Sequence, residues 1–149
     1  MIIISPYSRK IISGKESPKN YPYWTELIEL LNKYEIIQIG TKEEKQLTKN
    51  FKKDLKLNEI KELIKNSDFF ISVDNFLPHL AHHINKHGVV IFGLSDPNIF
   101  GYPENLNILK DRIFLRKNQF SLWDESMYNI NSFESPARIY DLIAKKYKK

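Results

Sequence analysis

The chain has 149 residues, of which 42% are hydrophobic and 28% are charged, and its formal net charge is +5. This length suits one domain, residues 1–149, with a single buried core. The chain has no cysteine, which excludes a disulfide scaffold and a thiolate metal site. No stretch approaches the roughly 20 apolar residues that span a bilayer. Met1–Ile4 lacks the basic residues of a signal peptide, so we expect a cytoplasmic protein.

Much of the positive charge lies at the C-terminal end, in Lys145, Lys146, Lys148 and Lys149. Lysines suit the negative end of a helix dipole, and we favour that interpretation over a nucleic-acid tail. Aromatic residues are not interleaved with the cations as stacking platforms require, so nucleic acid is not the expected partner.

Apolar runs of strand length alternate with helical patterns along the chain. Strands are predicted at Ile2–Ser5, Ile36–Gly40, Phe69–Val73, Val89–Gly93 and, on a weaker pattern, Ile113–Leu115. Helices are predicted over Tyr23–Lys33, after a cap at Asn58, over Leu77–His87 with a stop at Gly88, and after Ser135-Pro136. This alternation predicts the α/β class: a single Rossmann-like domain whose parallel sheet carries helices on both faces.

The strand Phe69–Val73 ends on Asp74, and His79 follows in the first turn of the next predicted helix. In open α/β sheets ligands bind beyond the carboxyl ends of the strands, and a helix N-terminus there attracts anions. Asp74 and His79 could transfer protons. Alternatively, His79 donates to a phosphate while Asp74 holds the turn by accepting backbone N–H bonds, or Asp74 is a purely structural cap.

Other strand ends carry weaker signals. The loop after the first strand holds hydroxyls and cations, including Ser8, Arg9 and Lys19, which are the types that bind phosphate. Its spacing matches neither a P-loop nor a G-x-G-x-x-G fingerprint. Glu43 and Glu44 follow the second strand, where an acidic residue can bind ribose or simply favour a helix start.

Metal binding is not expected, although the chain has histidines at helical spacing. His79 and His83 lie four residues apart, but no H-E-x-x-H motif and no evident third ligand accompany them. The irregular, aromatic-rich segment from Asp96 to Asn131 is instead typical of a specificity loop.

Five motifs in order make the chain resemble the C-terminal half of family 9 glycosyltransferases, the ADP-heptose:lipopolysaccharide heptosyltransferases and their relatives. They are Ser5-Pro6-Tyr7-Ser8-Arg9, Lys19–Trp24, Ile36–Glu44, Asp74–Ala81 (similar to Asp-Thr-Gly-x-x-His-Leu-Ala) and Phe92–Pro97 (similar to Phe/Tyr-Gly-x-Thr-x-Pro). The resemblance implies one half of a GT-B fold that binds a nucleoside diphosphate sugar, with no other cofactor and an unspecified base.

By position, the resemblance assigns a binding role to each of these residues. Ser8 and Lys19, with Arg9 in the same loop, would meet phosphate, and Glu43 or Glu44 would hold the ribose. Asn75, Phe76, Leu77 and His79 would line the diphosphate, Asp74 would support the turn or touch the sugar, Ser95 and Asp96 would lie near the sugar, and Leu55 and Leu57 would border the base. Asn75 and Phe76 replace the family's Thr and Gly, which puts a bulky side chain where the backbone usually approaches phosphate.

The expected function is therefore glycosyl transfer by a donor-binding half. The first strand begins at Met1, which leaves no room for the half that supplies the acceptor site and general base in the family. We expect inverting, metal-independent transfer only when an acceptor-binding partner or a homo-oligomer completes the site. The alternative is a non-catalytic nucleotide-binding or sequestering protein. A deoxyribosyltransferase-type enzyme is disfavoured because the helix after Asp74 offers histidines but no glutamate nucleophile.

Overall fold

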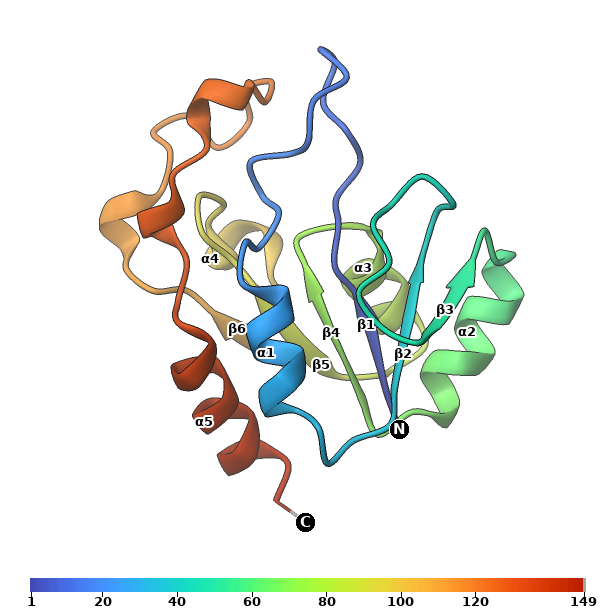
Figure 1. Ribbon diagram of the computed structural model, residues 1–149. Coiled ribbons are helices and arrows are strands. Elements are labelled where there is room, and N and C mark those ends of the chain that lie inside the picture. The colour runs from blue at the N-terminus through green and yellow to red at the C-terminus, as the bar shows by residue number, and fades with distance from the viewer. Residues whose placement is uncertain (149) are drawn as a thin grey trace.

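A parallel sheet of order β3-β2-β1-β4-β5-β6 runs through the centre of the computed structural model, which describes residues 1–148 (Figure 1). The strands are β1 (Ile2–Ser5), β2 (Ile36–Gly40), β3 (Asn50–Lys53), β4 (Phe69–Val73), β5 (Gly88–Ile91) and β6 (Leu106–Ile108). Every neighbouring pair is parallel. The predicted α/β class with one Rossmann-like sheet is confirmed.

Helices cover both faces of this sheet. They are α1 (Trp24–Leu30), α2 (Leu57–Asn66), α3 (Phe76–His83), the short α4 (Pro97–Phe100) and α5 (Pro136–Lys146). Three 3-10 turns, Arg112–Phe114, Glu125–Met127 and Ile130–Ser132, lie between β6 and α5. Within residues 1–148, no helix combines the length and the apolar character needed to cross a membrane.

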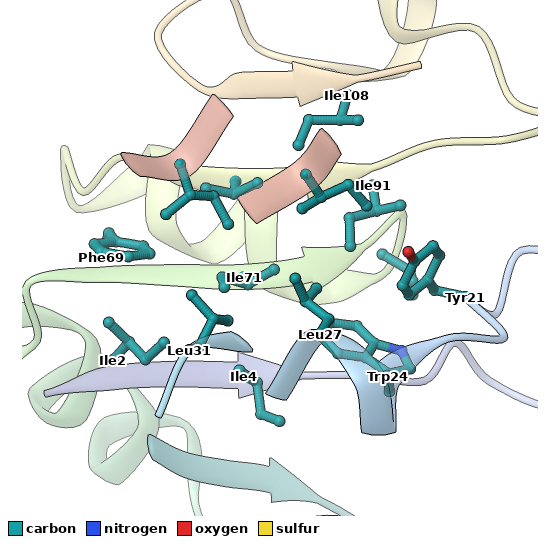
Figure 2. Packing of buried hydrophobic residues seen from close by; sticks show 14 of the residues in the cluster. Ile2, Ile4, Tyr21, Trp24, Leu27, Leu31, Phe69, Ile71, Ile91 and Ile108 are labelled. Atoms are coloured by element: carbon teal, nitrogen blue, oxygen red, sulfur yellow. The ribbon is translucent and has the colours of Figure 1, made fainter. Parts of the chain in front are cut away.

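Alternation along β1 divides the core into two layers. Ile2 and Ile4 pack with the side chains of α1 and α5, whereas Ile3 packs with α2 and α3. Figure 2 shows the first layer, in which Leu27 and Leu31 lie over the strands. All four residues of β1 are buried, as expected for a strand with helices on both sides.

The order of the strands creates the place for a binding site. The chain moves from β1 outward to β2 and β3, and it then returns to add β4 on the other side of β1. Loops leaving the carboxyl ends of β1 and β4 therefore diverge, which opens a crevice between them. Ser5 pairs with Ser72 at this edge, so the ends of the two strands lie level.

The first three predicted strands have the observed bounds, while the later ones need correction. β5 begins at Gly88 and ends at Ile91. A strand at 113–115 is wrong: Asp111 accepts from the amide of Ile113 and caps a 3-10 turn whose Ile113 side chain is 79% exposed. The edge strands β3 and β6 were not predicted, since β3 has Phe51 as its one large apolar residue and β6 is three residues long.

Helix ends also differ from the sequence pattern. α2 begins at Leu57, one residue before the predicted cap Asn58, and the Glu59 carboxylate accepts from the amide of Lys56 at 3.0 Å. α3 ends at His83 because Asn85 adopts a left-handed conformation with φ 57°. Gly88 is needed for packing instead, because a Cβ there would lie 2.4 Å from the Phe70 ring.

Two leucines of α1 test the core assignment. Leu27 is fully buried and Leu30 is 40% exposed. We expect Leu27→Ala to lower the free energy of unfolding by about 2–5 kcal/mol through lost burial and a residual cavity. Leu30→Ala should cost less than about 1 kcal/mol. Urea denaturation of both variants measures the difference, and equal losses would contradict the packing of α1 described above.

Candidate functional site

A cleft of about 2100 Å³ lies at the carboxyl edge of the sheet, where the strand order reverses. Its lining comes from the ends of β1, β2 and β4, from the loop between β1 and α1, and from the segment 116–128. Figure 1 shows these connections rising together above the sheet. The crevice expected from the topology thus coincides with this cleft.

The amide of Asn75 joins the two sides of this crevice. Its Nδ2 donates to the carbonyl oxygen and hydroxyl of Ser5, at 3.1 and 3.0 Å, and to the carbonyl of Tyr7 at 3.1 Å. Its Oδ1 accepts from the amide of Leu77 at 3.0 Å and so caps α3. The structural cap that was one of the alternatives for Asp74 is therefore made by its neighbour Asn75, and the Asp74 carboxylate pairs with Lys19.

Ser8 makes a second connection across the crevice. Its hydroxyl donates to the carbonyl of Asp74 at 2.8 Å, and its amide donates to Oδ1 of Asn20 at 2.8 Å. The side chain is nearly buried. Ser8 lines the cleft, but its two donors hold the loop in place within the protein.

Lys19 and Asp74 form an ion pair inside the cleft. Nζ of Lys19 lies 3.6 Å from Oδ2 of Asp74, and the two side chains are 22% and 13% exposed. Because both groups are mostly withdrawn from water, each supports the other's charge. The pair fixes an ammonium group beside the N-terminus of α3, and both features favour an anion.

Segment 116–128 supplies a second cation that the sequence analysis missed. The Arg116 guanidinium lies 3.6 Å from the centre of the Trp123 ring, and Nζ of Lys19 lies 5.8 Å from it. Arg116 donates to the carbonyls of Gln119 and Ser121, each at 2.9 Å. Burial lowers the pKa of Arg116, while the nearby Asp74 carboxylate raises it. The aromatic richness of 96–131 was the available signal, but it did not single out Arg116.

Glu44 lies over the end of β2. Its carboxylate rests against Gly40, where an added Cβ would come within 1.8 Å of Oε2. Burial raises the pKa of Glu44 to about 7, and the negative charges of Glu16 and Asp54 act in the same direction. This residue, more than the exposed Glu43, brings a carboxyl group into the cleft wall.

His79 also lines the cleft, from the first turn of α3. Its Nδ1 lies 2.7 Å from the hydroxyl of Tyr102, a residue outside the lining. His79 and Asp74, which were predicted to converge, therefore share one cleft. Within residues 1–148 no cluster of three His, Asp or Glu side chains has the geometry of a metal site.

The cleft brings together most of the predicted binding residues. Those in the lining are Ser8, Arg9, Lys19, Glu43, Glu44, Asp74, Asn75, Phe76, His79 and Ser95, together with Leu55. Three others lie elsewhere. The Leu77 side chain is fully buried in the core, and Leu57 is exposed at the start of α2.

Asp96 is the third predicted residue outside the cleft lining. Its carboxylate caps α4 and pairs with both terminal nitrogens of Arg112, at 2.9 and 2.7 Å. The hydrogen bonds from Arg112 lower the pKa of Asp96. Both oxygens thus fasten the segment after β6 to the start of α4. Spacing along the chain could not have predicted this two-bond pairing with Arg112.

Substitution of Asn75 tests the connection across the crevice. Asn75→Ala should cost about 2 kcal/mol, because α3 loses its cap and the acceptors on Ser5 and Tyr7 lose their donor. Asn75→Asp keeps an acceptor for the cap but sets a carboxylate against carbonyl oxygens, so it should also destabilise. The control Asn129→Ala removes one bond to the Asn131 amide. Urea denaturation that ranked Asn129→Ala equal to Asn75→Ala would contradict this role.

Glu44 should make stability depend on pH. Its pKa in the folded protein, about 7, lies above the ordinary value of 4.5. Between these values the unfolded chain releases the proton and the folded protein keeps it, so this contribution to stability falls as pH rises from about 4.5 to 7. The melting temperature of Glu44→Gln should fall less between pH 5 and pH 8 than that of the unchanged protein. Glu43→Gln is the control, and a Glu44→Gln profile identical to it would refute this assignment.

Comparison with known proteins identifies the family to which this chain is similar. The family model for glycosyltransferase family 9 (heptosyltransferase) matches residues 1–121. No curated protein sequence gives a significant match.

Two solved structures share the fold over 97% of this chain. The dodecameric iron-containing heptosyltransferase TibC, in complex with ADP-D-β-D-heptose, has a TM-score of 0.71 at 17% identity, with 44% of its own chain covered. The Escherichia coli ADP-heptose lipopolysaccharide heptosyltransferase II has a TM-score of 0.66 at 17% identity, with 45% covered. The chain thus spans less than half the length of either structure. On the match of residues 1–121, the chain belongs to glycosyltransferase family 9.

Proposed function

We propose that this domain binds a nucleoside diphosphate sugar in the cleft and serves as the donor-binding half of a GT-B glycosyltransferase. The observation that carries the proposal is the convergence of Lys19, His79 and the N-terminus of α3 on one crevice. A diphosphate is the part of such a ligand that a cation, a ring N–H and a helix end suit together.

The N-terminal end of α3 can offer a backbone N–H donor to a ligand. Asn75 already occupies the Leu77 amide, and Pro78 has no N–H. Among the first three helical positions described, this leaves the amide of Phe76 to face a ligand. The Phe76 side chain is 47% exposed at the cleft, so it can border a ligand instead of closing the site.

The remaining contacts follow from the position of each residue around that diphosphate. Glu44 at the end of β2 is suited to ribose hydroxyls, and Leu55 beyond β3 offers an apolar surface to the base. Ser95, in the connection between β5 and α4, lines the cleft and would contact the sugar of the ligand. Support for this arrangement comes from the family and from the ADP-heptose bound by the similar TibC structure.

In a transfer reaction the oxygen of an acceptor hydroxyl would attack the anomeric carbon while the bond from that carbon to the diphosphate breaks, and the hydroxyl proton would pass to a base in the acceptor site. Lys19 and His79 would then stabilise the negative charge that develops on the departing diphosphate. The acceptor site would be supplied from outside these residues, by another segment, a partner chain or a second copy. The short coverage of the heptosyltransferase structures and the dodecameric state of TibC motivate that part of the proposal.

Thermal-shift and calorimetric titration with ADP, GDP, UDP and their sugar derivatives test the proposal. A ligand at 100 times its dissociation constant should add roughly 2.7 kcal/mol to stability. Lys19→Gln should weaken binding about ten- to a hundredfold through loss of a charge-assisted hydrogen bond, and should flatten the salt dependence.

Lys33→Gln is the matched control, because Lys33 lies beyond the other end of α1, over the Tyr34 ring. It should bind as the unchanged protein does. The absence of any nucleotide-dependent shift would overturn the proposed function. Unaltered binding by Lys19→Gln would remove Lys19 from the site.

A further inference from the structure

Tyr102 contacts the cleft residue His79 from outside the cleft. The two atoms that meet are the phenol oxygen and Nδ1, 2.7 Å apart, and the two rings stand nearly perpendicular. For the hydroxyl of Tyr102, the structure of residues 1–148 provides this one hydrogen-bond partner. A tyrosine hydroxyl can donate or accept, so the direction of this hydrogen bond depends on the tautomer of His79: with no hydrogen on Nδ1, the phenol donates and Nδ1 accepts.

If the phenol donates, this hydrogen bond selects one neutral tautomer of His79. A neutral imidazole with Nδ1 as acceptor has its hydrogen on Nε2. His79 lines the cleft and Tyr102 does not, so the nitrogen turned away from Tyr102 is the one available to a ligand. That nitrogen is then a donor, which is the role a phosphate oxygen requires.

Tyr102 is itself held in place from its other side. The His82 ring stacks on it with centroids 3.9 Å apart and planes 12° apart, and Nδ1 of His82 bonds the Glu104 carboxylate. The carbonyl of Tyr102 accepts from the amide of Asn105 at 3.0 Å and from Nδ2 of Asn107 at 2.9 Å. A phenol anchored by both its ring and its backbone can orient a partner.

This anchoring also links Tyr102 to the sheet. Oδ1 of Asn105 accepts from the amide of Gly88 at the start of β5, at 3.0 Å. His79 and His82 lie almost one turn apart on α3, so they contact Tyr102 through its hydroxyl and its ring face respectively. The loop after α4 is therefore fitted to the exposed side of α3.

We propose that Tyr102 is a positioning residue that holds His79 in the tautomer with Nε2–H directed to the cleft, where it donates to the diphosphate of a nucleotide ligand. The ligand part rests on the function proposed above, whereas the tautomer part does not. Without the hydroxyl, His79 would be divided between its two neutral tautomers and would lose its fixed ring orientation. A contact that only packed the two rings would leave the tautomer unchanged when the hydroxyl alone is removed.

Tyr102→Phe keeps the ring stacked on His82 and removes the hydroxyl. Nitrogen-15 NMR of histidine-labelled protein without ligand, recorded at alkaline pH, should show His79 as the Nε2–H tautomer. In Tyr102→Phe its signals should move toward a mixture of both tautomers. The resonance is assigned by its loss in His79→Ala. An unchanged His79 tautomer in Tyr102→Phe would overturn the proposal.

Binding of the nucleoside diphosphate that gives the largest thermal shift among ADP, GDP and UDP is the second arm. Tyr102→Phe should weaken binding about three- to tenfold, and it should have no further effect in a His79→Ala background. Tyr140→Phe, on α5 outside the cleft lining, is the control and should bind normally.

An equal loss from Tyr102→Phe with and without His79 would overturn the positioning role. If the unchanged protein bound none of these nucleotides, the proposed function and the ligand part would both fail. The NMR experiment needs no ligand, so it separates that failure from an error in the tautomer assignment.

Discussion

The cleft depends on one side-chain amide at the point where the strand order reverses. Asn75 donates to groups of Ser5 and Tyr7 on the β1 side and caps α3 on the β4 side. Parallel strands with diverging loops leave their carboxyl ends open, and backbone groups there need partners. By pairing with three of them and with the Ser5 hydroxyl, Asn75 brings the two loops together without filling the space above them. Lys19, Asp74 and His79 take their places around this junction.

The charged side chains of the cleft are held by different kinds of partner. Asp74 holds Lys19, and neutral carbonyls hold Arg116 over the Trp123 ring. Lys19 and Arg116 both lie near the Trp123 ring, and Asp74 is the carboxylate beside them. These groups together carry an excess of positive charge close to the N-terminus of α3. At the other wall Glu44 is withdrawn from water and keeps its proton to a higher pH than usual. A ligand with an anionic middle and hydroxyls on one side fits such a division of charge.

Much of the framework was predictable because it depends on local patterns. Continuous apolar runs identified β1, β2 and β4 with the observed bounds, since central parallel strands are buried on both faces. β3 and β6 were not predicted, because an edge strand can be held by hydrogen bonds to its one neighbouring strand without a continuous apolar sequence. Ile113 suggested a strand, yet Asp111 caps a turn there and no neighbouring strand is paired with it in the described sheet.

The amino-acid sequence was enough to predict the α/β class, the family resemblance, and the polar residues that follow each central strand. Periodicity and motif order are properties of the chain alone, so these were accessible without coordinates. Which of those residues face the cleft became known from the three-dimensional arrangement. In that arrangement Asn75 caps α3, Asp96 pairs with Arg112, and Tyr102 contacts His79. Sequence spacing could not reveal these contacts, because a hydrogen bond forms between groups that folding brings within about 3 Å, whatever their separation along the chain.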